Sequence, residues 1–234
     1  PNNPTGCAYD EATLRGLARL CVERDFYIVS DEIYEHLIYA GARHISIASF
    51  GPEVQARTLL VNGVSKTYAM TGFRIGYLAG PADVVAAMSN YQSQATSAPC
   101  TPAQHAAAVA LTMDQGCVEP MRAAFEARRN ELCALINGIP GIQCHCPDGA
   151  FYVMMNVKGL LGHRYEGKML ATSLDFCQTL LQSQCVALVP GSAFMAEGYC
   201  RLSYAISLES IQEGMRRIRA FVDRLEPPVI GTEA

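Results

Sequence analysis

Short apolar runs alternate with helical patterns in the first half of the chain. Apolar side chains recur at helical spacing over residues 13–24, and Asp10 stands where it can cap that helix. The runs at 26–30, 58–61 and 75–79 are typical of buried parallel strands. This alternation predicts an α/β layer architecture.

The second half places helices and strands in a different order. Residues 81–110 are mostly helical, with a break near 97–102. Further helices are expected at 118–136, 175–183 and 207–225, and strands at 149–155, 186–189 and 201–205. The pattern predicts a first domain over residues 1–115 and a smaller α+β domain over residues 116–234.

Two polar residues directly follow predicted strands. Asp31 comes after the 26–30 run, and Lys66 comes shortly after the 58–61 run. In open α/β sheets the reactive groups gather at the carboxyl ends of the strands. Their position therefore predicts that Asp31 and Lys66 belong to a functional site.

Lys66 has neighbours that suit a phosphorylated aldehyde. An unpaired lysine is costly to bury, and burial makes its amine a nucleophile near neutral pH. Ser65 offers a hydroxyl and Arg74 a planar bidentate cation, which together suit a phosphate group. A covalent lysine beside a phosphate clamp suggests pyridoxal phosphate as the cofactor. The alternative is an exposed loop lysine, which an isolated Ser-Lys pair would favour.

The run from Ser65 to Gly76 reads Ser-Lys-x-x-x-x-x-Gly-x-Arg-x-Gly. It resembles the lysine signature of the class I/II aminotransferases, which are fold type I pyridoxal-phosphate enzymes. The resemblance implies a three-layer αβα large domain with a mostly parallel sheet, of which residues 1–115 form the C-terminal part. It also implies that Lys66 binds the cofactor covalently and acts in catalysis, while Ser65 and Arg74 hold the phosphate.

Asp31 and Tyr34 form an Asp-x-x-Tyr segment that resembles the same family. A carboxylate beside the pyridine nitrogen keeps that nitrogen protonated, and the resemblance implies this role for Asp31. Tyr34 and Asn3 are implied to contact the phenolic oxygen of the cofactor, with Asn3 also facing the substrate. The alternatives are a helix cap for Asp31 and an ordinary turn, Pro-Asn-Asn-Pro-Thr-Gly, for Asn3.

Arg201 resembles the arginine that binds the substrate α-carboxylate in this family. A guanidinium fork makes two hydrogen bonds to a carboxylate and so orients the Cα–H bond against the cofactor ring. The segment Pro-Gly-Ser-Ala-Phe at 190–194 matches the family's lead-in to this arginine. A solvated arginine or a structural ion pair is the alternative.

The implied reaction moves an amino group between an L-amino acid and a 2-oxo acid. Segments 149–152, 159–162 and 167–172 look most like bacterial-type aspartate aminotransferases, which favours aspartate and 2-oxoglutarate as the pair. The family also implies a cytoplasmic enzyme that is a homodimer when full-length. A lyase or synthase on the same scaffold, and an inactive fragment, stay open as alternatives.

Composition and charge argue against other classes of protein. The net charge is −4 and no basic block occurs, so neither a nucleic-acid nor a membrane partner is expected. The ten cysteines include no Cys-x-x-Cys pair, which favours free buried thiols in a reducing compartment and no metal site. The chain begins inside a turn without a methionine, so we expect it to be the larger part of a longer protein.

Overall fold

The computed structural model describes residues 1–39 and 41–228, and the chain divides into two compact units. The first unit comprises Pro1 and Cys7–Arg122, and the second comprises Asn2–Gly6 and Ala123–Ala234. The sequence predicted a boundary near residue 115 and placed the first residues in the first domain. The opening turn instead packs with the second unit, where Gly149 N–H donates to the Gly6 carbonyl at 2.9 Å. Residues 229–234 of the expected second domain lie outside the described residues.

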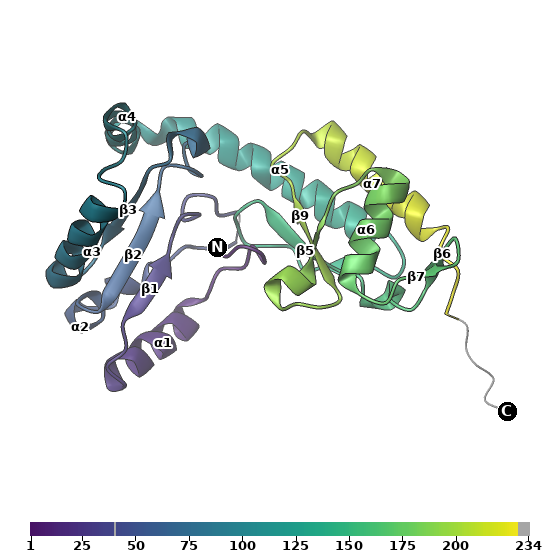
Figure 1. The fold of residues 1–234 in the computed structure, drawn as a ribbon, viewed down its shortest axis with the longest axis horizontal. Coiled ribbons are helices and arrows are strands. Elements are labelled where there is room, and N and C mark those ends of the chain that lie inside the picture. The colour runs from purple at the N-terminus through teal and green to yellow at the C-terminus, as the bar shows by residue number, and fades with distance from the viewer. Residues whose placement is uncertain (40, 229–234) are drawn as a thin grey trace. The chain divides into compact units, whose positions relative to one another are not determined.

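The first unit combines helices with a small sheet, and its elements are labelled in Figure 1. Its helices are α1 (Glu11–Glu23), α2 (Pro52–Gln55), α3 (Ala82–Ala95) and α4 (Thr101–Thr112). Its strands are β1 (Ile28–Asp31), β2 (Thr58–Gly63) and β3 (Gly76–Ala79). The predicted cap of α1 is confirmed, because the Asp10 carboxylate accepts a hydrogen bond from Thr13 N–H at 2.7 Å.

The three strands form one sheet in the order β1-β2-β3. β1 is parallel to β2, with Asp31 opposite Val61, and this confirms the predicted α/β class. The prediction that β3 is also a parallel strand is wrong, because β3 pairs antiparallel with β2. A parallel strand needs a long crossover, usually a helix, whereas residues 64–75 contain only the 3-10 turn η2 (Thr71–Phe73).

Strand β1 is covered on one face only. Ile28 packs against a cluster that includes Ala18 of α1 and Val54 of α2. On the other face Val29 is 69% exposed, so within the described residues the expectation of a fully buried strand is wrong. A strand buried on both faces and a strand with one apolar exposed face have the same hydrophobic pattern, which is why the sequence could not separate them.

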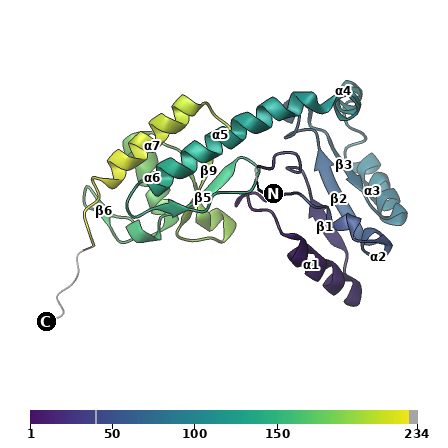
Figure 2. The ribbon, with the colours of Figure 1, turned by 180° about the vertical axis from the view of Figure 1, so that it is seen from behind.

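The second unit is an α+β arrangement around a four-stranded antiparallel sheet with the order β4-β5-β9-β8. Its strands are β4 (Gln143–Cys144), β5 (Tyr152–Asn156), β6 (Arg164–Tyr165), β7 (Lys168–Met169), β8 (Val189–Pro190) and β9 (Tyr199–Ser203). Its helices are α6 (Ser173–Gln184), α7 (Leu208–Val222) and the later part of α5 (Val118–Asn137). Figures 1 and 2 show α7 alongside this part of α5, where Gln212 donates to Glu131 at 3.2 Å. In the part of the chain that the structure describes, no helix is long and apolar enough to cross a bilayer.

Candidate functional site

Lys66 lies in a tight turn that follows β2. Val64, which is fully buried, packs with Ile75 and with Ala103 and Ala107 of α4. Two backbone hydrogen bonds close the turn, from Tyr68 N–H to the Val64 carbonyl at 3.4 Å and from Ala69 N–H to the Lys66 carbonyl at 3.3 Å. Lys66 itself is half-buried.

Gly63 allows β2 and β3 to approach closely at the start of this turn. A Cβ atom on Gly63 would lie 2.8 Å from the Ile75 carbonyl oxygen and 3.1 Å from Gly76 Cα. Both neighbours are backbone atoms, which cannot move aside without displacing a strand. We therefore expect Gly63→Ala to lower the free energy of unfolding by about 2 kcal/mol.

Urea unfolding measures this effect, with Gly72→Ala as the matched control in the same connection. A Cβ atom on Gly72 would meet nothing within 4 Å, so this variant should unfold at close to the wild-type urea concentration. Equal unfolding midpoints for Gly63→Ala and wild type would contradict the packing argument.

Tyr34 and Asp31 lie beside the turn that carries Lys66. The Lys66 Nζ atom lies 5.9 Å from the centre of the Tyr34 ring, within the range of a cation–π contact. Tyr34 is 5% exposed, so its ring forms part of the wall of the site. Asp31 is the last residue of β1, and its Oδ1 accepts a hydrogen bond from Ile33 N–H at 3.2 Å. The Asp31 side chain is otherwise exposed, which leaves carboxylate lone pairs for a ligand.

Ser65 and Arg74 come from the two ends of the β2–β3 connection. Gly63 pairs with Gly76 in the sheet, and Val64 N–H bonds to the Ile75 carbonyl at 3.4 Å. Ser65 and Arg74 are the next residues on the two sides. Arg74 has a left-handed backbone with φ of 58°, and its Nη1 donates to the Thr71 carbonyl at 2.9 Å. Its guanidinium is exposed and retains further N–H donors for an anion.

Arg201 and Asn3 meet in the second unit. Arg201 lies on β9 opposite Met154 of β5, and its Nη1 donates to Asn3 Oδ1 at 2.7 Å. The fold therefore joins two predicted site residues that are 198 positions apart.

Two aromatic rings hold the Arg201 guanidinium. Its Cζ atom lies 4.5 Å from the centre of the Tyr152 ring and 4.9 Å from the centre of the Phe194 ring. Stacking of this kind orients a guanidinium without using up its donors. Neither aromatic residue was predicted to belong to the site, although both stand in segments that resemble the family, Gly-Ala-Phe-Tyr at 149–152 and Pro-Gly-Ser-Ala-Phe at 190–194.

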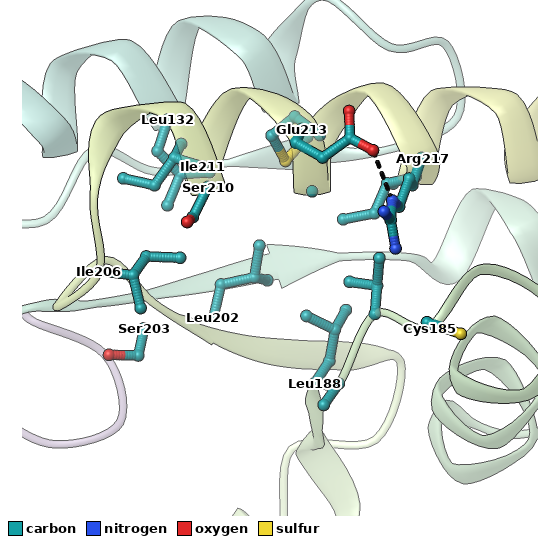
Figure 3. Close-up of a pocket in the computed structure, with 15 residues that line it drawn as sticks. Leu132, Cys185, Leu188, Leu202, Ser203, Ile206, Ser210, Ile211, Glu213 and Arg217 are labelled. Atoms are coloured by element: carbon teal, nitrogen blue, oxygen red, sulfur yellow. Dashed lines mark hydrogen bonds and ion pairs between the residues drawn. The ribbon is translucent and has the colours of Figure 1, made fainter.

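A separate cavity of about 330 Å³ lies in the second unit beside α7 (Figure 3). Leu132, Leu202 and Ile211 contribute to its apolar lining. Arg217 Nε donates to Glu213 Oε1 at 2.7 Å on one side. Neither of the second unit's predicted site residues lines this cavity, so it contributes nothing to the predicted site.

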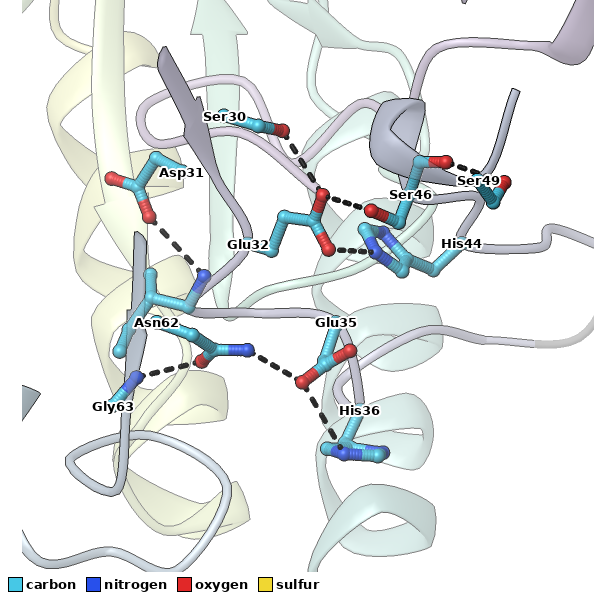
Figure 4. A network of polar contacts seen from close by, with 11 residues as sticks. Ser30, Asp31, Glu32, Glu35, His36, His44, Ser46, Ser49, Asn62 and Gly63 are labelled. Atoms are coloured by element: carbon cyan, nitrogen blue, oxygen red, sulfur yellow. Dashed lines mark hydrogen bonds and ion pairs between the residues drawn. The ribbon is translucent and has the colours of Figure 1, made fainter. Parts of the chain in front are cut away.

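Within the described residues, one group has the ligand types and spacing for a metal ion. The ligand atoms of Glu32, Glu35 and His44 lie within 4.8 Å of one another. Figure 4 shows that each of the two carboxylates already accepts hydrogen bonds from neighbouring side chains. The spacing of cysteines and histidines did not predict this group, because the fold brings its members together. All ten cysteines are free, but only Cys133, Cys177 and Cys200 are buried, so the expectation of buried thiols is wrong for most of them.

Comparison with known proteins places these features in a family. The family model described as aminotransferase class I and II matches residues 1–218. The aspartate aminotransferase of Geobacillus stearothermophilus is 45% identical over 226 residues, which cover 95% of this chain and 56% of that protein. The aspartate aminotransferase of Bacillus subtilis (strain 168) is 43% identical over 96% of this chain and 56% of its own length.

The likeness extends to three dimensions. The crystal structure of the aspartate aminotransferase from Rhizobium meliloti matches with a TM-score of 0.94 at 42% identity, over 97% of this chain and 57% of that chain. The present chain thus spans a little over half the length of these relatives. Its fold is that of the fold type I transferases. Family match, identity and fold agree, and the chain belongs to the class I and II aminotransferases.

Proposed function

We propose that this chain carries the lysine and the carboxylate-binding arginine of a pyridoxal-phosphate-dependent aminotransferase. The observation that carries the proposal is the position of Lys66. Its half-buried amine lies beside the Tyr34 ring, just after β2, and β2 pairs with the strand that ends at Asp31. The favoured amino acid is aspartate, which the names of the relatives support, and the proposed 2-oxo acid is 2-oxoglutarate.

The residues of the first unit fit pyridoxal phosphate by their donor types. Lys66 supplies an amine for the aldehyde, Asp31 an exposed carboxylate for the ring nitrogen and Tyr34 a hydroxyl for the phenolic oxygen. Ser65 and Arg74, on either side of the β2–β3 connection, would hold the phosphate. When bound, this cofactor supplies an electron sink conjugated to the substrate Cα.

Each residue then has one task in amino transfer. Asp31 keeps the proton on the ring nitrogen, because a carboxylate next to it favours the charged form. Arg201 binds the substrate α-carboxylate with its fork, and Asn3 and the two aromatic rings orient that fork. The Lys66 amine acts first as a base, which removes the proton from the substrate Cα. It then acts as an acid, which delivers a proton to the cofactor carbon that carries the aldehyde.

Product analysis tests the proposal and separates it from the other use of the same scaffold. With pyridoxal phosphate, aspartate and 2-oxoglutarate present, we expect glutamate and oxaloacetate in equal amounts. Pyruvate and ammonia formed from an amino acid alone would instead indicate a lyase, a class that the names of the relatives do not favour. Absence of both product sets, with no cofactor bound, would contradict the proposal for this chain.

A cytoplasmic homodimer is a further part of this proposal for the whole protein. Light scattering after size-exclusion chromatography would measure the mass of the particle. A mass of twice the chain would support the dimer, and a mass equal to one chain would contradict it for the protein measured.

A further inference from the structure

Two carboxylates hold the turn after β1, and the proposed reaction uses neither of them. Glu32 is 3% exposed and accepts hydrogen bonds from Ser46 Oγ at 2.7 Å and Ser30 Oγ at 3.1 Å. Its other oxygen lies 3.1 Å from His44 Nε2 (Figure 4). Burial alone would raise the pKa of Glu32, but these three partners hold it below its ordinary value. Glu32 is therefore ionised, and its hydrogen bonds connect the turn to the segment that carries His44 and Ser46.

Glu35 connects the same turn to the end of the neighbouring strand. Asn62 Nδ2 donates to Glu35 Oε1 at 2.5 Å, and Asn62 Oδ1 accepts from Gly63 N–H at 2.7 Å. Asn62 is 5% exposed, so this amide is buried and both of its ends are in use. A carboxylate can only accept and a backbone N–H can only donate, which fixes the orientation of the amide.

This hydrogen bond lies between the two segments that carry the reactive groups. Glu35 follows Tyr34 directly, and Asn62 stands four residues before Lys66. The backbone contact between the two segments ends where Glu32 N–H bonds to the Val61 carbonyl at 2.9 Å. Beyond that point the Asn62 side chain reaches across to Glu35 (Figure 4). A hydrogen bond to a charged group is among the stronger kinds in proteins, and here the donor amide of Asn62 is buried.

We propose that the Glu35–Asn62 hydrogen bond is a positioning element that keeps Tyr34 beside Lys66 and so directs aldehydes to this lysine. The effect on aldehyde capture rests on the proposed function. The Glu35–Asn62 hydrogen bond itself, which we call the tether, is a property of the chain without any cofactor. Glu35 and Asn62 act through Tyr34 and Lys66, and are positioning residues rather than catalytic ones. A bond that served only stability would leave the reactivity of Lys66 unchanged in any variant that stays folded.

The test uses Asn62→Asp, which keeps the shape of the side chain, removes the donor and sets a second carboxylate against Glu35. Two reactivities of Lys66 are measured in the folded chain by mass spectrometry, each relative to the exposed Lys168. The first is capture of pyridoxal phosphate followed by borohydride reduction. The second is acetylation by a trace of acetic anhydride, which needs no cofactor.

We expect the two ratios to move in opposite directions in Asn62→Asp. Capture of pyridoxal phosphate by Lys66 should fall about tenfold, since a lost hydrogen bond of about 1.4 kcal/mol corresponds to that factor. Acetylation of Lys66 should rise by about threefold, because a half-buried amine released from its turn becomes more accessible. General loss of structure would also expose the half-buried Lys66 and remove its capture of the cofactor, so both ratios are compared only in variants whose circular dichroism spectrum matches that of wild type.

A double variant provides the rescue. In Glu35→Gln with Asn62→Asp the new amide can donate to the new carboxylate, whose second oxygen still accepts from Gly63 N–H. Both ratios should return to within about twofold of wild type, because the two changes are coupled.

Asn137→Asp is the matched control for the single variant. The Asn137 amide also bridges two groups, since it donates to the Cys144 carbonyl at 3.3 Å and accepts from Cys144 N–H at 2.8 Å. It belongs to the second unit, and both ratios should stay at wild-type values.

The outcomes separate this proposal from the proposed function. If Asn62→Asp is folded and its acetylation ratio equals that of wild type, or if the double variant fails to restore that ratio, the tether is overturned. If Lys66 of the wild-type chain captures no more pyridoxal phosphate than Lys168 does, the proposed function fails for this chain. In that case the acetylation ratios of the single and double variants still decide whether the tether exists.

Discussion

Replacing Lys66 by alanine is expected to abolish amino transfer, with a loss of about 10⁴-fold or more. The amine has two tasks in the proposed reaction, covalent attachment of the cofactor and proton transfer at the substrate Cα. Alanine can perform neither, since it removes the amine that lies 5.9 Å from the centre of the Tyr34 ring. Initial rates of glutamate formation from aspartate and 2-oxoglutarate measure the loss.

Lys168→Ala is the control for this substitution. Lys168 is an exposed lysine on β7 in the second unit, so its removal should leave the rate of transfer within about twofold of wild type. A Lys66→Ala variant that retained a tenth of the activity or more would contradict the proposed role, provided that its circular dichroism spectrum matched that of wild type.

Arg201→Lys is expected to lower kcat/KM for the amino acid by about 100-fold, which corresponds to about 2.7 kcal/mol of lost transition-state binding. Lysine keeps the positive charge but offers no planar fork for a carboxylate. It also loses the stacking between Tyr152 and Phe194, which lie 4.5 Å and 4.9 Å from the guanidinium.

The comparison of substrates makes this test specific. An amine substrate without an α-carboxylate should react equally slowly with wild type and Arg201→Lys, because the fork has nothing to bind. Arg216→Lys, at an exposed position of α7, is the control and should behave like wild type toward both substrates. If Arg201→Lys lowered the two rates by the same factor, Arg201 would be a structural residue and not the carboxylate site.

The sequence predicted those parts of the fold in which local pattern decides the structure. The helix from Glu11 begins at the predicted cap, and α5 begins and ends within one residue of its expected limits. Periodicity and capping are local properties, so they can be read without knowledge of the fold. The Lys66 turn was found for the same reason, since its motif is contained in twelve consecutive residues.

Features that depend on distant segments could not be predicted in this way. The direction of β3 depends on the connection before it, and the open face of β1 depends on which elements cover it. The Arg201–Asn3 contact joins residues at opposite ends of the chain. The Asn62–Glu35 bond needs the parallel register of β1 and β2, which no pattern of apolar residues specifies. Contacts of this kind follow from the assembled sheet and not from the sequence around either residue.

The proposed role of Lys66 is tested by identifying which lysine captures pyridoxal phosphate. The chain has three lysines, Lys66, Lys158 and Lys168, so peptide mapping after borohydride reduction gives an unambiguous answer. We expect the pyridoxyl group on Lys66, with the other two lysines at background. Equal labelling of the three lysines, or labelling of Lys158 or Lys168 in place of Lys66, would contradict this role.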